Sequence, residues 1–245
     1  TAIWLDRIAA IESGSAGSNT MGLRDHLDAA VDQGANLIQV VIYNLPGRDC
    51  AALASNGELA PTDIATYQSD YIDPIVEIMG DPAYANLRIV TVVEIDSLPN
   101  LVTNVSPRPT ATPECDVMKA NGNYVQGVGY ALAQLGALPN VYNYIDIGHH
   151  GWLGWTDNFA ASGQVFLQAA RANGAEPSDV HASPRTWRTT ASWTSRSSRR
   201  PPWSAASRCG RAPPGSTGTT TSPRWSTRRR TVSTWSGSAS TPGSA

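Results

Sequence analysis

The stretch RIVTVVEID, residues 88–96, decides the fold of this chain. It is a short run of apolar and β-branched residues, apolar on both alternating faces, and it ends in an aspartate. Two similar runs, QVVIYNL (residues 39–45) and VYNYI (residues 141–145), lead to Asp49 and Asp146. Runs of this kind are typical of strands buried on both faces, as in a parallel sheet covered by helices.

Helix-like patterns precede and separate these runs, at residues 1–11, 21–31, 61–79, 123–135 and 158–172. The first pattern places Ile3, Trp4, Ile8 and Ile11 on one helical face. The alternation of helices with strands predicts an α/β fold, either a βα barrel or a doubly wound sheet.

Composition divides the chain into two parts. Up to His181 there are 7 Lys and Arg against 20 Asp and Glu, whereas residues 182–245 hold 11 Arg, 15 Ser, 12 Thr, 7 Pro, 5 Trp and no acidic residue. We therefore expect one domain at residues 1–181 and a disordered tail at residues 182–245. No run of 18 apolar residues and no signal-peptide pattern is present, which predicts neither a membrane span nor a leader in this chain.

The aspartates at the strand ends indicate an active-site mouth, because polar side chains that follow parallel strands gather at one edge of the sheet. Asp96 directly follows a buried run, so burial should raise its pKa and keep it protonated, as a general acid requires. Asp49 lies beside Arg48, which should favour its ionised form. A carboxyl pair divided in this way suits glycoside hydrolysis. The alternative is that these aspartates only cap helices or order loops.

The segment GHHGWLGW, residues 148–155, indicates sugar binding. Trp152 and Trp155 offer flat apolar faces to sugar rings, and His149 can bond hydroxyl groups. Paired tryptophans also occur in protein cores, which is the alternative. The adjacent His149 and His150 suggest a metal site, but no third ligand stands at a useful spacing. No metal and no cofactor are therefore predicted.

Three segments, YNLPGRDCAALASNGE (43–58), VVEIDSLPNLVTN (92–104) and NVYNYIDIGHHGWLGW (140–155), together resemble the cellulases of glycoside hydrolase family 6. The resemblance covers Thr1 to about His181. It implies a distorted (β/α) barrel that hydrolyses β-1,4-glucosidic bonds of cellulose with inversion of the anomeric centre. It also implies a secreted monomer that acts on cellulose and cello-oligosaccharides.

The resemblance assigns roles to individual residues. Asp96 matches the proton donor and Asp49 the carboxylate that assists it. Tyr43 and Ser55 match residues at the cleavage subsite, and His149 and Trp152 match sugar-binding positions, with Trp155 beside them. We also expect substrate binding at Arg48 and, in a supporting role next to the sugar-binding loop, at Asp146. Cys50 and Cys115 match a family disulfide; buried reduced thiols are the alternative. Ile95 and Asp96, followed by Pro99, resemble bacterial exo-acting members, which favours a cellobiohydrolase over an endoglucanase. A non-catalytic glucan-binding fragment is a further alternative.

The chain also departs from the family pattern. The family's first barrel strand, with its substrate-binding Trp, is expected before Thr1. After His181 the family's C-terminal strands, sugar-binding segment and proposed catalytic base do not follow. The tail has no carboxylate that could replace that base, and Cys209 is left without the family's second disulfide partner. We therefore expect an incomplete barrel that folds poorly and has little or no activity.

The genetic code suggests why the tail looks as it does. When a reading frame shifts by one base, codons for Phe, Leu, Ile, Val and Met yield Ser and Trp, and codons for Tyr, His, Asn and Asp yield Thr. In the neighbouring frame, residues 214–221 permit a segment that resembles one in the family. Residues 232–241 permit a strand-like alternation. We interpret residues 182–245 as an out-of-frame translation. The rival interpretation is a linker or a basic arm that attracts nucleic acid.

Overall fold

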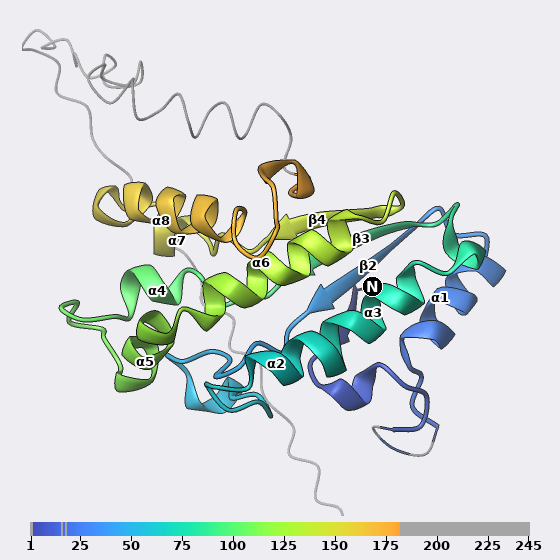
Figure 1. Ribbon diagram of the computed structural model, residues 1–245, viewed down its shortest axis with the longest axis horizontal. Coiled ribbons are helices and arrows are strands. Elements are labelled where there is room, and N and C mark those ends of the chain that lie inside the picture. Colours follow the sequence, from blue (N-terminus) through green and yellow to red (C-terminus); the bar gives the residue numbers. More distant parts are fainter. Residues whose placement is uncertain (1, 16, 18, 182–245) are drawn as a thin grey trace, which may run out of the picture. The chain divides into compact units, whose positions relative to one another are not determined.

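Four parallel strands form the centre of the computed structural model, which describes residues 2–15, 17 and 19–181 (Figure 1). They are β1 (Ala2–Leu5), β2 (Leu37–Ile42), β3 (Arg88–Val93) and β4 (Val141–Ile145). Their order in the sheet equals their order in the sequence. Each strand therefore reaches its parallel neighbour through a crossover connection, the arrangement of a βα barrel. Within the described residues the sheet is open, which agrees with the incomplete α/β barrel that the sequence predicts.

Helices fill these connections. The α-helices are α1 (Leu23–Asp32), α2 (Ile64–Thr66), α3 (Asp73–Met79), α4 (Asn100–Thr103), α5 (Pro113–Asn121), α6 (Asn123–Gly136), α7 (His150–Leu153) and α8 (Thr156–Ala169). A π-helical segment, η3 (Tyr67–Ile72), joins α2 to α3. Single 3-10 turns lie at η1 (Ile8–Ala10), η2 (Leu53–Ser55), η4 (Pro82–Tyr84) and η5 (Pro177–Asp179). The helices predicted at residues 21–31, 61–79, 123–135 and 158–172 are confirmed, with shifted ends.

Local sequence sets several of these helix boundaries. Thr112 caps α5, because its side-chain oxygen accepts a hydrogen bond from the Cys115 N–H at 3.2 Å. Pro113 then occupies the first turn, where its missing N–H costs nothing. The helix ends at Gly122, whose φ of 72° is the left-handed conformation that glycine adopts most easily.

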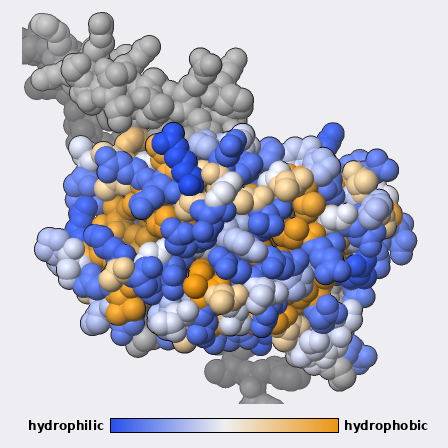
Figure 2. Space-filling view, viewed as in Figure 1, coloured by the Kyte–Doolittle hydropathy of each residue, from blue (hydrophilic) through white to orange (hydrophobic). Residues whose placement is uncertain are grey.

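One face of the sheet forms the core. Val40, Ile42, Ile89 and Val93 point to this face and are fully buried under the helices. Figure 1 shows α3 and α6 lying across the strands on that side. The outer surface of this helical layer carries small hydrophobic patches separated by hydrophilic residues (Figure 2).

The opposite face of the sheet is more open among the described residues. The strand register aligns Trp4, Val41, Val92 and Tyr144 on this face. Trp4 is 52% exposed and Tyr144 is 42% exposed. The expectation of burial on both faces therefore holds for one face only.

The predicted helix at residues 1–11 is wrong. This stretch forms β1 and then the short turn η1, and the Tyr43 N–H donates to the Leu5 carbonyl at 3.1 Å. Pairing with β2 outweighs the weak helical pattern, because Leu5 is buried on the core face while Trp4 points to the other. A strand with an exposed Trp thus lies at this end of the described chain, where the sequence predicted a helix and placed such a strand before Thr1.

The predictions for residues 182–245, including the unpaired Cys209, lie outside the described residues. Among the helices of the described part, none combines the length and apolar character that a membrane crossing requires.

Candidate active site

The three strand-end aspartates meet at the carboxyl edge of the sheet. Asp49 lies in the loop after β2, Asp96 follows β3 and Asp146 follows β4. The Asp96 N–H donates to Asp146 Oδ2 at 3.0 Å, and the Asn100 side-chain amide donates to Asp49 Oδ1 at 3.3 Å and to the Asp96 carbonyl at 2.6 Å. The structure therefore brings together the carboxyl groups that the sequence singles out.

The backbone at this edge is unusual. Asp49, Glu94 and Asp96 have φ values of 50°, 52° and 51°. Residues other than glycine seldom adopt this left-handed conformation, which costs free energy and persists where surrounding contacts enforce it, often at functional sites.

Burial raises the pKa of Asp96, as predicted, and the negative charges of Asp49 and Asp146 raise it further. The nearby His149 acts in the opposite direction. The side chain is partly buried, so it keeps access to a substrate while its neighbours favour the protonated form. A carboxyl in this state can donate a proton to a leaving group.

Among the described contacts, Arg48 makes no hydrogen bond or ion pair with Asp49, its neighbour in the sequence. Its guanidinium instead donates to main-chain carbonyls, to Ser55 at 2.9 Å and to Asp6 and Tyr43 at 2.7 Å each. Its central carbon also lies 4.1 Å from the centre of the Tyr43 ring. Arg48 thus fastens the turn that carries Ser55 to the end of β2.

Tyr43 is buried, and the Arg48 guanidinium lies over its ring. Burial and the charge of Asp49 raise the pKa of its hydroxyl, while a hydrogen bond with Ser55 lowers it. Trp4 packs edge-on against the Tyr43 ring, with centroids 6.0 Å apart. Sequence reasoning missed Trp4 because the helical interpretation hid its position on an exposed face. The alternation of Ile3, Trp4 and Leu5 was the available signal.

The segment after β4 begins with His149 and ends in an exposed indole. The His149 ring accepts the Gly151 N–H at 3.1 Å and lies 6.2 Å from the Trp152 ring. Trp152 is partly buried and donates its indole N–H to Thr103 Oγ1 at 2.6 Å. Trp155 is 64% exposed. The two tryptophans therefore differ, and Trp155 presents the free aromatic face.

A disulfide joins Cys50 to Cys115, so the alternative of reduced thiols is wrong. The bond links the loop that carries Asp49 to α5. The Tyr124 hydroxyl from α6 supports the same loop, since it donates to the Gly47 carbonyl at 2.6 Å and accepts the Cys50 N–H at 3.1 Å. Two helices thus fix the position of Asp49.

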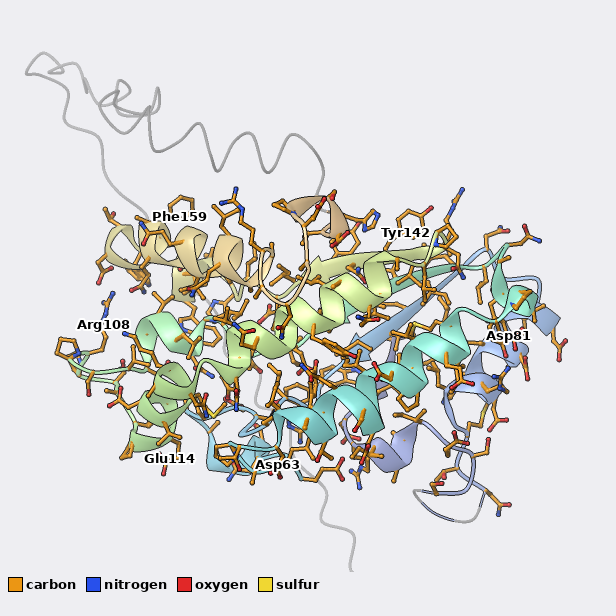
Figure 3. All side chains as sticks on the ribbon, in the orientation of Figure 1. Asp63, Asp81, Arg108, Glu114, Tyr142 and Phe159 are labelled. Carbon is orange, nitrogen blue, oxygen red and sulfur yellow. A yellow bond between two sulfur atoms is a disulfide. The ribbon has the colours of Figure 1, made fainter. Side chains whose placement is uncertain are left out.

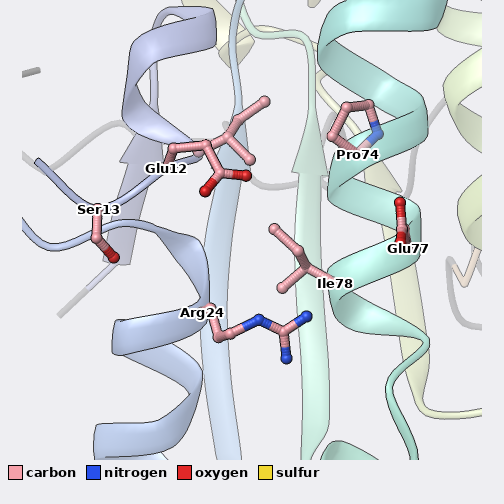
Figure 4. Close-up of a pocket in the computed structure, with 7 residues that line it drawn as sticks. Glu12, Ser13, Arg24, Pro74, Glu77 and Ile78 are labelled. Carbon is pink, nitrogen blue, oxygen red and sulfur yellow. The ribbon is translucent and has the colours of Figure 1, made fainter. Parts of the chain in front are cut away.

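The described surface also carries charged side chains and a hollow. Figure 3 shows the labelled Asp63, Asp81, Arg108 and Glu114 around the margin of the view. A hollow of about 180 Å³ opens between α1 and α3 (Figure 4). Its lining residues are Ile11, Glu12, Ser13, Arg24, Pro74, Glu77 and Ile78. It contains none of the predicted site residues, and Arg24 is paired with Asp81 at 2.8 Å.

Known proteins are similar to this chain in sequence and in fold. Exoglucanase A of Cellulomonas fimi is 52% identical over 179 residues, which cover 70% of this chain and 19% of that protein. The catalytic domain of Cellulomonas fimi Cel6B matches with a TM-score of 0.64 and 48% identity, over 73% of this chain and 40% of that one.

A second solved structure is cellobiohydrolase II (Cel6A) from Humicola insolens in complex with glucose and cellotetraose. It matches with a TM-score of 0.57 and 35% identity, over 71% of this chain and 47% of that one. The chain thus spans less than half the length of each of these three proteins. The sequence pattern of the family described as Glycosyl hydrolases family 6 matches residues 1–182. Because this match covers most of the 245 residues of the chain, the chain belongs to glycosyl hydrolase family 6.

Proposed function

We propose that this chain is part of a secreted, monomeric cellulase that hydrolyses β-1,4-glucosidic bonds with inversion. The observation that carries the proposal is Asp96, a partly buried carboxyl with a raised pKa, held beside Asp49 and Asp146. The family and the exoglucanase relative support the same reaction. The Cys50–Cys115 disulfide suits an oxidising, extracellular environment.

In the proposed reaction Asp96 gives its proton to the glycosidic oxygen as the bond to the anomeric carbon breaks. In the same step water attacks that carbon from the opposite face and loses its proton to a base. Asp49 keeps Asp96 protonated through its nearby charge, and Tyr43 and Ser55 surround the cleavage position. We assign the base to a segment that this reading of the chain does not contain.

The substrate is proposed to be cellulose or a cello-oligosaccharide. Trp155 exposes an apolar face on which a glucose ring can stack, and the same segment carries the neighbouring rings of His149 and Trp152. The relatives named exoglucanase and cellobiohydrolase favour exo action over endo action. Arg48 retains a supporting role, through its bonds to the main chain around Tyr43 and Ser55.

A second candidate is a non-catalytic glucan-binding fragment. The exposure of Trp155 favours it, because an exposed indole needs no completed barrel to stack on a sugar ring. The two candidates differ in whether Asp96 matters, since binding without turnover does not require an acid.

We also propose that residues 182–245 arise from an out-of-frame translation. The family match ends at residue 182, where the composition changes, which supports the proposal. A frame-corrected chain, in which the neighbouring frame replaces the codons after His181, should hydrolyse cellotetraose. The chain as it stands should show little or no hydrolysis, because its tail has no aspartate or glutamate to serve as base.

Two measurements examine this proposal. One compares cellotetraose hydrolysis by the two chains. The other sequences the coding DNA across codons 181 and 182. A single intact frame, with tail peptides confirmed by mass, would show that the tail is genuine. Equal hydrolysis by both chains would show that the tail does not impair the enzyme.

A further inference from the structure

Glu94 is a buried carboxyl that the proposed reaction does not use. It directly follows β3 and is 1% exposed. Its Oε2 accepts the N–H groups of Asn44 and Leu45 at 3.1 and 3.2 Å. Its Oε1 accepts the Tyr67 hydroxyl at 2.8 Å. Donors from the loop after β2 and from η3 thus converge on one side chain beneath the active site.

These bonds connect the segments that carry the two proposed catalytic carboxyls. Asn44 and Leu45 begin the loop that leads to Asp49, and Glu94 lies two residues before Asp96. The Glu94 N–H also donates to the Ile42 carbonyl at 2.9 Å. Glu94 therefore both donates to β2 and accepts from the loop that follows it. Glu94 and Asp96 both have the left-handed backbone that needs surrounding contacts to persist. The Glu94 carboxyl supplies such contacts.

We propose that Glu94 is a positioning residue, which holds the Asp96 segment against the Asp49 loop. Through this contact the charge state of Glu94 influences the protonation of Asp96. The proposal rests on the roles proposed for Asp96 and Asp49. An ionised Glu94 accepts every donor that faces it, and bonds to an ionised group are stronger than bonds to a neutral one. When Glu94 takes up a proton, the proton stays on the carboxyl, and the Tyr67 hydroxyl can turn to accept a hydrogen bond from it. The main-chain bonds then weaken, and the Asp96 segment loosens.

Burial of Glu94 places this change near neutral pH. Burial raises the pKa of Glu94 to about 7, against the opposing hydrogen bonds from Tyr67, Asn44 and Leu45 and the positive charge of Arg48. The other titratable groups facing it are Tyr71 from η3 and Tyr124 from α6. Burial raises the pKa of both hydroxyls, so they stay neutral when Glu94 changes charge.

A carboxyl titration tests the proposal on the full chain. Aspartate carboxyl carbons are labelled with ¹³C and followed by NMR from acidic to alkaline pH, and the signal of Asp96 is identified by its loss in Asp96→Asn. We expect the Asp96 signal to show its own step and a second, smaller step near pH 7. Glu94→Gln should remove the second step and lower the pKa of Asp96 towards the usual range, because the segment loosens.

Two tyrosine variants provide a matched pair. Tyr67→Phe should move the second step to higher pH, because the Tyr67 hydroxyl favours the ionised form of Glu94. Tyr84→Phe removes an equally buried tyrosine that donates to Asp28 at 2.6 Å, and it should leave both steps in place. Circular dichroism shows whether each variant is folded.

A single-step titration of Asp96 in the unaltered chain would overturn the proposal, as would a second step that survives Glu94→Gln. If Glu94→Gln does not fold, Tyr67→Phe decides, and an unmoved second step in that variant counts against the proposal. The titration needs no turnover. A failure of the proposed function would appear separately, as absent hydrolysis by the frame-corrected chain.

Discussion

The Asp96→Asn variant of the frame-corrected chain is expected to lose about 100- to 10,000-fold in kcat on cellotetraose, the contribution typical of a positioned general acid. Asparagine has the same shape and keeps the main-chain N–H bond of residue 96 to Asp146, but its amide has no acidic proton to transfer to the leaving group. KM should change little, because the loss falls on the transition state. Initial rates over a range of cellotetraose concentrations measure both constants.

The pH profile follows from the same carboxyl. Asp96 acts while protonated, so kcat should fall as pH rises through its pKa. Since burial and the charges of Asp49 and Asp146 raise that pKa, the fall should begin above the usual range for aspartate. In Asp96→Asn this alkaline limb should disappear from whatever activity is left.

Asp70→Asn is the matched control, because Asp70 is exposed and bonds only to the neighbouring Ser69 among the described contacts. Its kinetics should equal those of the unaltered chain. A loss below threefold in Asp96→Asn would contradict the assignment of Asp96 as the acid. Glucan binding without turnover in every chain would favour the non-catalytic candidate instead.

Removing the Cys50–Cys115 disulfide is expected to lower the free energy of unfolding by about 2–5 kcal/mol. The bond closes a loop with a sequence separation of 65 residues, so it strongly limits the freedom of the unfolded chain. Urea unfolding of the Cys50→Ala, Cys115→Ala double variant, followed by circular dichroism, measures the loss.

A reductant provides the control for this second prediction. It should lower the urea midpoint of the unaltered chain to that of the double variant, and it should leave the double variant unchanged. Equal midpoints for the oxidised chain and the double variant would show that the link between the Asp49 loop and α5 does not stabilise the fold.

Much of the fold could be predicted where local pattern and tertiary environment agree. The run at residues 141–145 corresponds to β4, and the pattern at residues 123–135 corresponds to α6. The raised pKa of Asp96 could be anticipated for a related reason. A carboxyl directly after a buried strand must lose part of its hydration.

Prediction failed where distant segments decide the outcome. Residues 2–5 form a strand because β2 lies alongside, and the short alternation of Ile3, Trp4 and Leu5 is too weak a local signal to predict that pairing. Arg48 adjoins Asp49 in sequence, yet the fold places carbonyls of Asp6, Tyr43 and Ser55 around its guanidinium. The role of Glu94 as a hydrogen-bond acceptor could not be predicted, because its donors come from segments 27 to 50 residues away in the sequence.

The central claim is that the described residues form the acid side of an inverting active site. The most direct measurement is the anomeric form of the first product, read by NMR within the first minutes of cellotetraose hydrolysis by the frame-corrected chain. Inversion at a β-1,4 bond predicts that the new reducing end appears as the α-anomer and then equilibrates. Initial release of the β-anomer would contradict the account.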